Sequence, residues 1–187
     1  MVSLASLWLP IVLSAILVFF AAFLAWVVLP HHRKDFRPLP DQDALLAEMR
    51  ARQLAPGQYA LPHTLDREEM ATDAFREKVR AGPTGFLYLR DPAKHLAMGS
   101  RLTQAFVYYL VLGLFVAYIG YVTLPPGTAY LTVFRVTGTA AFLGHCGALF
   151  PRSIFFGVSW SMTWKEVADG ILYALLTAGT FAWLWPG

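Results

Sequence analysis

Several features that are common in soluble enzymes are missing from this sequence. It has one cysteine, Cys146, so the chain can form neither an internal disulfide nor a thiolate metal cluster of its own. Charged residues make up only 14% of the 187 residues, against about 25% in an ordinary globular protein. There is no phosphate-binding glycine loop, no nucleophile elbow and no HExxH zinc motif. These absences argue against a soluble enzyme.

The few charges are concentrated in one stretch of the chain. Twelve of the fifteen Lys and Arg residues, and ten of the twelve acidic residues, lie between Arg33 and Arg101. The rest is almost purely apolar, and the hydrophobic content of the whole chain is 57%. This pattern is typical of a membrane protein with one polar insert. Because the net charge of +3 is small and its basic residues flank apolar segments, it indicates contact with membrane lipids and not with nucleic acid.

Four apolar stretches are long enough to cross a membrane, which takes about 20 residues in a helix. They cover residues 7–29, 103–124, 129–150 and 167–185, and prolines end the last three. We therefore expect an all-α membrane protein with four transmembrane helices and a small, mainly helical cytoplasmic insert between helices 1 and 2. The expected regions are helix 1 at 1–30, the insert at 31–102, a hairpin of helices 2 and 3 at 103–150, an interfacial aromatic segment at 151–166 and helix 4 at 167–187.

The distribution of positive charge predicts the orientation. Lys and Arg fall on one side of the four expected spans, and the two termini and the Pro-Pro-Gly turn at 125–127 carry none. Segments rich in Lys and Arg stay on the cytoplasmic side of a membrane. We therefore expect a multi-pass protein of the inner (plasma) membrane with a cytoplasmic insert and both termini outside.

The insert is expected to contain two helices and a short strand pair. Capping residues and charge patterns predict helices at 41–53, capped by Asp41, and at 66–81. Residues 85–90 read as a strand, with 58–61 as its partner. An isolated pair of strands is marginally stable in water, so we expect the insert to lean on the membrane, on its own helices or on another subunit.

Small residues recur along the expected spans. Close packing through small side chains holds membrane helices together. The fourth span carries a stripe of small residues at every fourth position, which consists of Gly170, Ala174, Ala178 and Ala182. The third span contributes Gly144. The stripe predicts either packing within the bundle or docking of a partner subunit.

Two ionisable residues fall inside the third expected span. Arg135 is the one charge well inside a span, which marks it as a functional candidate, although it lies close enough to the outer face to reach lipid headgroups. His145 lies near the inner end, where it could ligate a haem or chlorophyll-type cofactor, but one histidine cannot supply a bis-histidine haem site. A hydrogen-bonded packing role is the simpler interpretation, and no cofactor is predicted.

The remaining histidines, His31, His32, His63 and His95, lie in the insert among carboxylates. Imidazole and carboxylate groups can bind zinc, but the motif spacings of metal sites are absent, so no metal site is predicted. No catalytic residue stands out either.

Three segments resemble a known family. LPHHRKDFRPLP after the first span, GPTGFLYL in the insert and YALLTAGTFAWLWP at the C-terminus are similar to those of short four-helix bacterial inner-membrane proteins. The resemblance covers nearly the whole chain. That family has no assigned activity, so the resemblance implies architecture and location but transfers no site residues.

The leading hypothesis is a non-catalytic accessory or assembly subunit of a larger inner-membrane complex, respiratory or photosynthetic, with other membrane subunits as partners. One alternative is a small oligomeric transporter or channel whose path Arg135, Thr132, Thr137 and Thr139 would line. Another is a membrane metal-binding protein or enzyme that uses the histidines of the insert.

Overall fold

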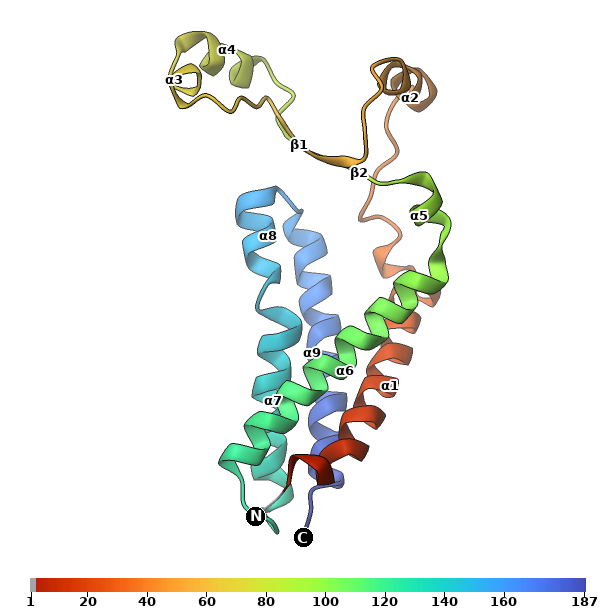
Figure 1. The fold of residues 1–187 in the computed structure, drawn as a ribbon, viewed down its shortest axis with the longest axis vertical. Coiled ribbons are helices and arrows are strands. Elements are labelled where there is room, and N and C mark those ends of the chain that lie inside the picture. Colours follow the sequence, from red (N-terminus) through yellow and green to blue (C-terminus); the bar gives the residue numbers. More distant parts are fainter. Residues whose placement is uncertain (1–2) are drawn as a thin grey trace. The chain divides into compact units, whose positions relative to one another are not determined.

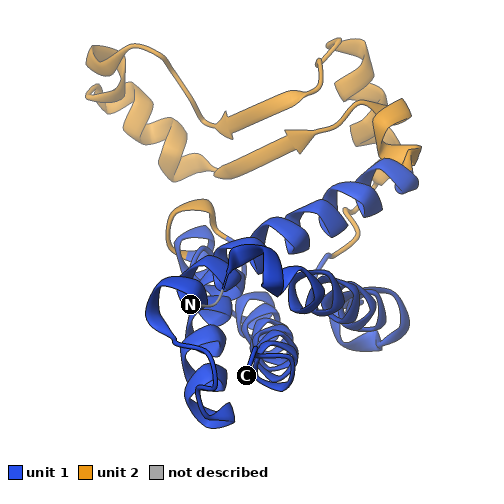
Figure 2. Cartoon of the chain, turned by 60° about the horizontal axis from the view of Figure 1, so that its bottom comes forward, with its two compact units in different colours: residues 1–36, 98–153, 158–187 blue, residues 37–97, 154–157 orange. Residues whose placement is uncertain are grey.

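The computed structural model describes residues 3–187, which form two compact units (Figure 2). Of the described residues, unit 1 consists of 3–36, 98–153 and 158–187, and unit 2 of 37–97 and 154–157. The first unit holds the apolar helices and the second holds most of the polar insert.

Unit 1 is a bundle of long helices (Figure 1). A 3-10 turn, η1 (Leu4–Leu7), leads into α1 (Trp8–Phe23), and a π-helical turn, η2 (Leu24–Val28), follows it directly. The other helices are α6 (Met98–Thr123), α7 (Tyr130–Cys146), α8 (Leu149–Phe156) and α9 (Trp160–Trp183). α9 packs against α7 and α1, and α6 packs against the same two helices.

Within the described residues, three helical stretches are long and apolar enough to cross a membrane. They are Leu4–Val28, Met98–Thr123 and Tyr130–Phe156. The chain is therefore a mainly helical protein of the membrane type, as the sequence predicts.

The bundle is packed with small and aliphatic side chains and is apolar on its outside as well. Leu7, Val116, Ala117, Val133 and Phe181 are fully or almost fully buried. Large apolar side chains on the outer faces are half exposed or more, among them Phe20, Val27, Leu131 and Leu143. Exposure on this scale is costly in water and favourable in lipid.

The structure differs from the sequence prediction around Pro151, which was expected to end the third span. The helix is instead interrupted at residues 147–148 and resumes as α8, with Pro151 in its first turn. Proline has no N–H to donate to the carbonyl four residues earlier, which is that of Gly147. The break therefore lies one turn before the proline, and most of the segment 151–166 is helical.

Unit 2 contains a two-stranded antiparallel sheet and four short helices. Strands β1 (Gly57–Leu61) and β2 (Gly85–Leu89) pair with Gly57 opposite Leu89, which confirms the predicted strands. The helices are α2 (Gln42–Ala51), α3 (Arg67–Met70), α4 (Asp73–Ala81) and α5 (Pro92–Leu96).

Two details of the predicted insert are wrong. The helix expected at 66–81 is split into α3 and α4, because the Thr72 side chain accepts a hydrogen bond from the Phe75 N–H and starts a new helix. Asp41 precedes α2 as predicted but has a left-handed backbone (φ 45°), and its side chain caps nothing.

Candidate metal centre

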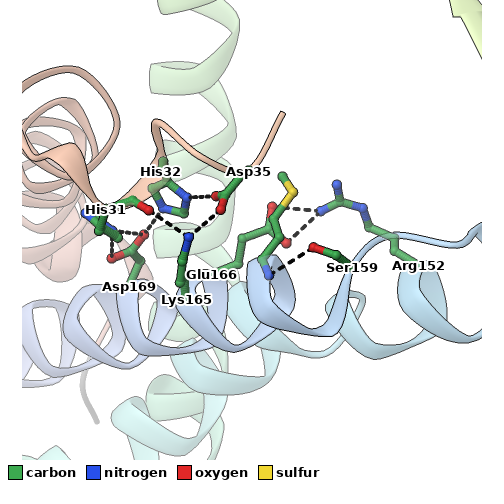
Figure 3. A network of polar contacts seen from close by, with 9 residues as sticks. His31, His32, Asp35, Arg152, Ser159, Lys165, Glu166 and Asp169 are labelled. Carbon is green, nitrogen blue, oxygen red and sulfur yellow. Dashed lines mark hydrogen bonds and ion pairs between the residues drawn. The ribbon is translucent and has the colours of Figure 1, made fainter. Parts of the chain in front are cut away.

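Five polar side chains from two distant segments of unit 1 meet where α1 ends and α9 begins (Figure 3). His31, His32 and Asp35 lie on the turn that leaves α1, and Lys165 and Asp169 lie on α9. Because residues four apart share one face of a helix, Lys165 and Asp169 both face this turn. We call these five residues the polar cluster.

The backbone presents the two histidines by departing twice from the regular α-helix. In η2 the Leu29 N–H donates to the Leu24 carbonyl oxygen at 2.9 Å, a bond that spans five residues instead of four. Leu29 is then extended, and Pro30 begins a 3-10 turn, η3 (Pro30–His32). Proline suits the first position of a helical turn, because its φ is already set and its missing N–H is not needed there.

His32 is the centre of the polar cluster. Its Nε2 lies 2.8 Å from Oδ2 of Asp169, and its Nδ1 lies 2.5 Å from Oδ2 of Asp35. The imidazole stacks on the indole of Trp26, with ring centroids 3.8 Å apart and an interplanar angle of 5°. His32 is only 6% exposed. The ring is therefore fixed in orientation on both edges and on one face.

His31 and Lys165 complete the polar cluster. Nε2 of His31 lies 3.3 and 3.4 Å from the two carboxylate oxygens of Asp169. The Lys165 ammonium donates to the His31 backbone carbonyl at 2.7 Å and to the carboxylate of Asp35. The Asp35 side chain is 2% exposed, so Lys165 and His32 neutralise a carboxylate that has almost no contact with solvent.

The electrostatics follow from this arrangement. Burial alone lowers the pKa of His32, but the hydrogen bonds and negative charges of Asp169 and Asp35 outweigh it, so the pKa is raised above its ordinary value. Burial raises the pKa of Asp35, yet Lys165 and His32 outweigh it and hold the pKa of that carboxyl below its ordinary value. Without a metal ion, the two carboxylates therefore favour the imidazolium form of His32.

The same atoms form a set that a metal ion could share. One ligand atom each from His31, His32 and Asp169 lies within 4.8 Å of the other two. Two ligands of a tetrahedral zinc ion, each about 2.05 Å from it, are about 3.3 Å apart, which is the distance between His31 Nε2 and Asp169 Oδ1. The shorter His32 contact has to open by about 0.5 Å to admit an ion.

Asp35 supplies the outer support that metal-bound histidines usually have. A ligating histidine typically donates its other ring N–H to a carboxylate, which fixes its tautomer and orientation. Nδ1 of His32 meets Asp35 in this way, and Lys165 in turn holds Asp35. The residues present therefore fit an ion bound at Nε2 of His32.

A partly open cavity of about 160 Å³ adjoins Asp169 in unit 1. His145, the residue singled out as a cofactor ligand, lines it between two tyrosines. Its ring centroid lies 6.1 Å from that of Tyr109 and 5.5 Å from that of Tyr173. Cofactor pockets are usually about 300–1,000 Å³, so the space beside His145 suits a small molecule and not a macrocycle.

The stripe of small residues on α9 faces the inside of the bundle. Ala174, Ala178 and Ala182 are buried. A Cβ atom on Gly170 would lie 2.4 Å from the Cys146 sulfur, so Gly170 marks a close approach of α9 to α7. Gly144, on α7, makes a similar approach to Leu112 of α6.

Arg135 lies on the outer face of α7 and is exposed. It borders an apolar groove of about 280 Å³ between α7 and α9, lined among others by Phe134, Phe142 and Ile171. Thr139 is also exposed, whereas the Thr137 hydroxyl is buried and donates to the Val133 carbonyl of its own helix. Arg135 and Thr139 therefore line the same outer groove, whereas Thr137 lies inside the bundle of the single chain.

Sequence reasoning missed Asp169, the residue on which the polar cluster converges. The residue was counted as part of an apolar span, and its distance from the histidines in sequence concealed the contact. A signal was available, because an acidic residue two positions into a predicted span needs a partner. His63 and His95 belong to unit 2 and are not in the polar cluster.

Comparison with known proteins adds no relative: no family model, no curated protein and no solved structure matches this chain.

Proposed function

We propose that this protein is a four-span membrane protein that binds a divalent transition-metal ion at the cytoplasmic end of its bundle. The ligands are His31, His32 and Asp169. The observation that carries the proposal is the position of the two Nε2 atoms, both within 3.4 Å of the Asp169 carboxylate. The outer support from Asp35 favours the same assignment.

α9 is the fourth span in this proposal. Its charged residues, Lys165, Glu166 and Asp169, all lie in its first ten residues, and each has a partner of opposite charge or a histidine. The next fourteen residues, 170–183, carry no charge and extend about 21 Å at 1.5 Å per residue. Pairing removes most of the cost of placing these charges at a membrane boundary.

The donor set narrows the choice of ion. Two imidazole nitrogens and one carboxylate oxygen are the protein ligands of many catalytic zinc sites and of non-haem ferrous sites. Magnesium and calcium prefer all-oxygen ligands, and copper(I) prefers sulfur. Zinc or ferrous iron is therefore the expected ion, and three protein ligands leave at least one coordination position for a further molecule.

The test is the metal content of the purified full-length chain. After treatment with a chelator and reloading with Zn²⁺ or Fe²⁺, the wild-type protein should retain about one ion per chain by elemental mass spectrometry. Asp35→Asn, which leaves all three ligands in place, should weaken binding about 10- to 100-fold. His63→Ala, an exposed histidine of unit 2, is the matched control and should change nothing.

The variant His31→Ala distinguishes a metal site from a set of ion pairs and hydrogen bonds that binds no metal, called a clasp here. In a clasp, His31 contributes only contacts of 3.3–3.4 Å from a side chain that is 32% exposed, so its removal should hardly affect stability or anything else. In a metal centre, the substitution removes one of three ligands and should abolish stoichiometric binding of the metal ion. Retention of a full equivalent of metal by His31→Ala would refute the proposal.

A second proposal is the accessory or assembly subunit expected from the sequence. The apolar groove beside Arg135 supports it, because this outer face of α7 and α9 offers a surface for the helix of another membrane subunit. Extraction from native membranes in a gentle detergent, followed by a native gel and mass spectrometry, tests it. Co-migration with a larger complex is expected, and migration of the chain alone would count against this role.

A further inference from the structure

The cavity beside Asp169 has the size of a single ring. Its volume of about 160 Å³ is close to the roughly 150 Å³ of an engineered protein cavity that admits benzene. Helices α6, α7 and α9 and the turn η2 contribute its walls. It therefore lies within unit 1 and is formed by well-packed helices, not by a mobile loop.

The walls of the cavity are mainly aromatic. Trp26, Tyr108, Tyr109 and Tyr173 contribute rings to it. Flat aromatic walls stack favourably on a flat ligand. The Tyr108 hydroxyl is already engaged, because it donates to the Gly144 carbonyl at 3.0 Å, so it is not available to a ligand.

Two polar groups on the walls lack partners. Tyr173 is 7% exposed, and within residues 3–187 its buried hydroxyl has no hydrogen-bond partner. Buried polar groups in proteins are nearly always paired, so an unpaired hydroxyl in a cavity wall calls for a partner from outside the chain. The ring nitrogens of His145 likewise make no hydrogen bond in the described part of the chain. The residues that line the cavity thus include a buried, unpartnered phenolic hydroxyl and an imidazole.

The charges around the cavity do not favour a charged ligand. Glu166 and Asp169 both line it. Glu166 is paired with Arg152 at 3.1 Å, and Asp169 is paired with the histidines of the polar cluster. Because both carboxylates are paired, the lining carries little net charge to attract either an anion or a cation. A neutral ligand fits best.

We infer that this cavity binds a neutral six-membered ring carrying a carbonyl oxygen, of the benzoquinone class, with the Tyr173 hydroxyl donating to that oxygen. The inference goes beyond the proposed metal site, because the cavity and its unpaired hydroxyl exist whether or not an ion binds to Asp169. A ring bound here lies next to the carboxylate of Asp169 and thus beside the proposed metal.

The test is binding of a tail-free dimethoxy-methyl-benzoquinone to the full-length protein in detergent, measured by titration calorimetry. One saturable site per chain is expected. Tyr173→Phe removes only the hydroxyl and should weaken binding about five- to tenfold. Tyr130→Phe, a half-exposed tyrosine on the outside of α7, is the matched control and should bind like the wild type.

Three results would overturn the inference. They are uptake of the probe without saturation, equal affinity in Tyr173→Phe and wild type, and saturable binding of tetramethylammonium in place of the quinone. The last would identify an aromatic cage for organic cations. Metal content measured on the same samples keeps the two proposals apart, because Tyr173→Phe should retain the metal, and His31→Ala should retain the quinone site.

Discussion

Lys165 donates a 2.7 Å hydrogen bond to the backbone carbonyl of His31, so the start of α9 is bonded directly to the turn that leaves α1. The same ammonium neutralises the buried carboxylate of Asp35. One lysine thus fixes the position of a proposed metal ligand and supports the residue that orients the other histidine.

Replacing Lys165 with methionine should destabilise the protein by about 3 kcal/mol. The substitution leaves the Asp35 carboxylate buried with one partner fewer, and removing one partner of a buried ion pair typically costs about 3–5 kcal/mol. Because the Lys165 side chain is 29% exposed, we expect the lower end of that range. Thermal unfolding in detergent measures the effect. Lys34→Met, at an exposed neighbouring lysine, is the control, and an equal loss in both variants would contradict the prediction.

The stability of the metal-free protein should pass through a maximum with pH. The pKa of folded His32 lies above 6.5, so its stabilisation is complete below pH 6.5 and is lost as the pH rises through the folded value. The pKa of folded Asp35 lies below 3.8, so its stabilisation is complete above pH 3.8 and is lost as the pH falls through the folded value. Melting temperatures measured in chelator across this range should decline on both sides.

His32→Gln should remove the alkaline decline, because no imidazolium is left to lose its proton. His63→Gln should preserve the full profile. A wild-type profile that stays flat as the pH rises beyond neutrality would show that the His32 pair contributes nothing to folding.

Gly170→Ala should destabilise the contact of α9 with α7. The new methyl group would lie 2.4 Å from the Cys146 sulfur, and overpacking of this kind costs about 1–3 kcal/mol. Gly179→Ala on the same helix has only the Tyr130 hydroxyl nearby, at 3.8 Å, and should be neutral or slightly stabilising. Unfolding midpoints of the two variants test this, and the double variant Gly170→Ala/Cys146→Ala should recover part of the loss.

If α9 is the fourth span, the insert and the C-terminus lie on opposite sides of the membrane. In a background with Cys146→Ala, the variants His63→Cys and Gly187→Cys should react with a membrane-impermeant thiol reagent from opposite sides. We expect the C-terminal thiol to be labelled in intact cells and the insert thiol only after lysis. Labelling of both from the same side would mean that α9 does not span.

How far the sequence predicts this molecule depends on whether a feature is local. Hydropathy and proline positions are local, so each expected span overlaps a helical stretch of unit 1, although α6 begins five residues and α9 seven residues before the expected start. The pairing of 58–61 with 85–90 follows from local strand signals on either side of a predicted helix. The split at Thr72 escaped notice, because a threonine inside a helical pattern signals a new cap only when its side chain bonds the backbone, as it does with Phe75.

The polar cluster could not be predicted in the same way. The sequence predicts no metal site, and its metal-binding alternative is spread over all the histidines of the insert. Asp169 meets His31 and His32 only because α9 packs beside α1, whereas His63 belongs to unit 2. Gly170 marks the close approach of α9 to α7, and the effect of such a small residue on distant contacts cannot be read from sequence spacing alone.

The π-helical turn η2 sets the direction in which the two histidines of the polar cluster leave α1. The hydrogen bond of η2 spans five residues instead of four, so the residues after it are shifted by one position relative to a regular helix. If the same five residues formed a regular α-helix with no residue removed, the residues that follow would be turned by about 100° around the helix axis. Both histidines would then point away from Asp169 although no ligand had been mutated. The spacing of this turn is therefore as much a determinant of the site as the identity of its side chains.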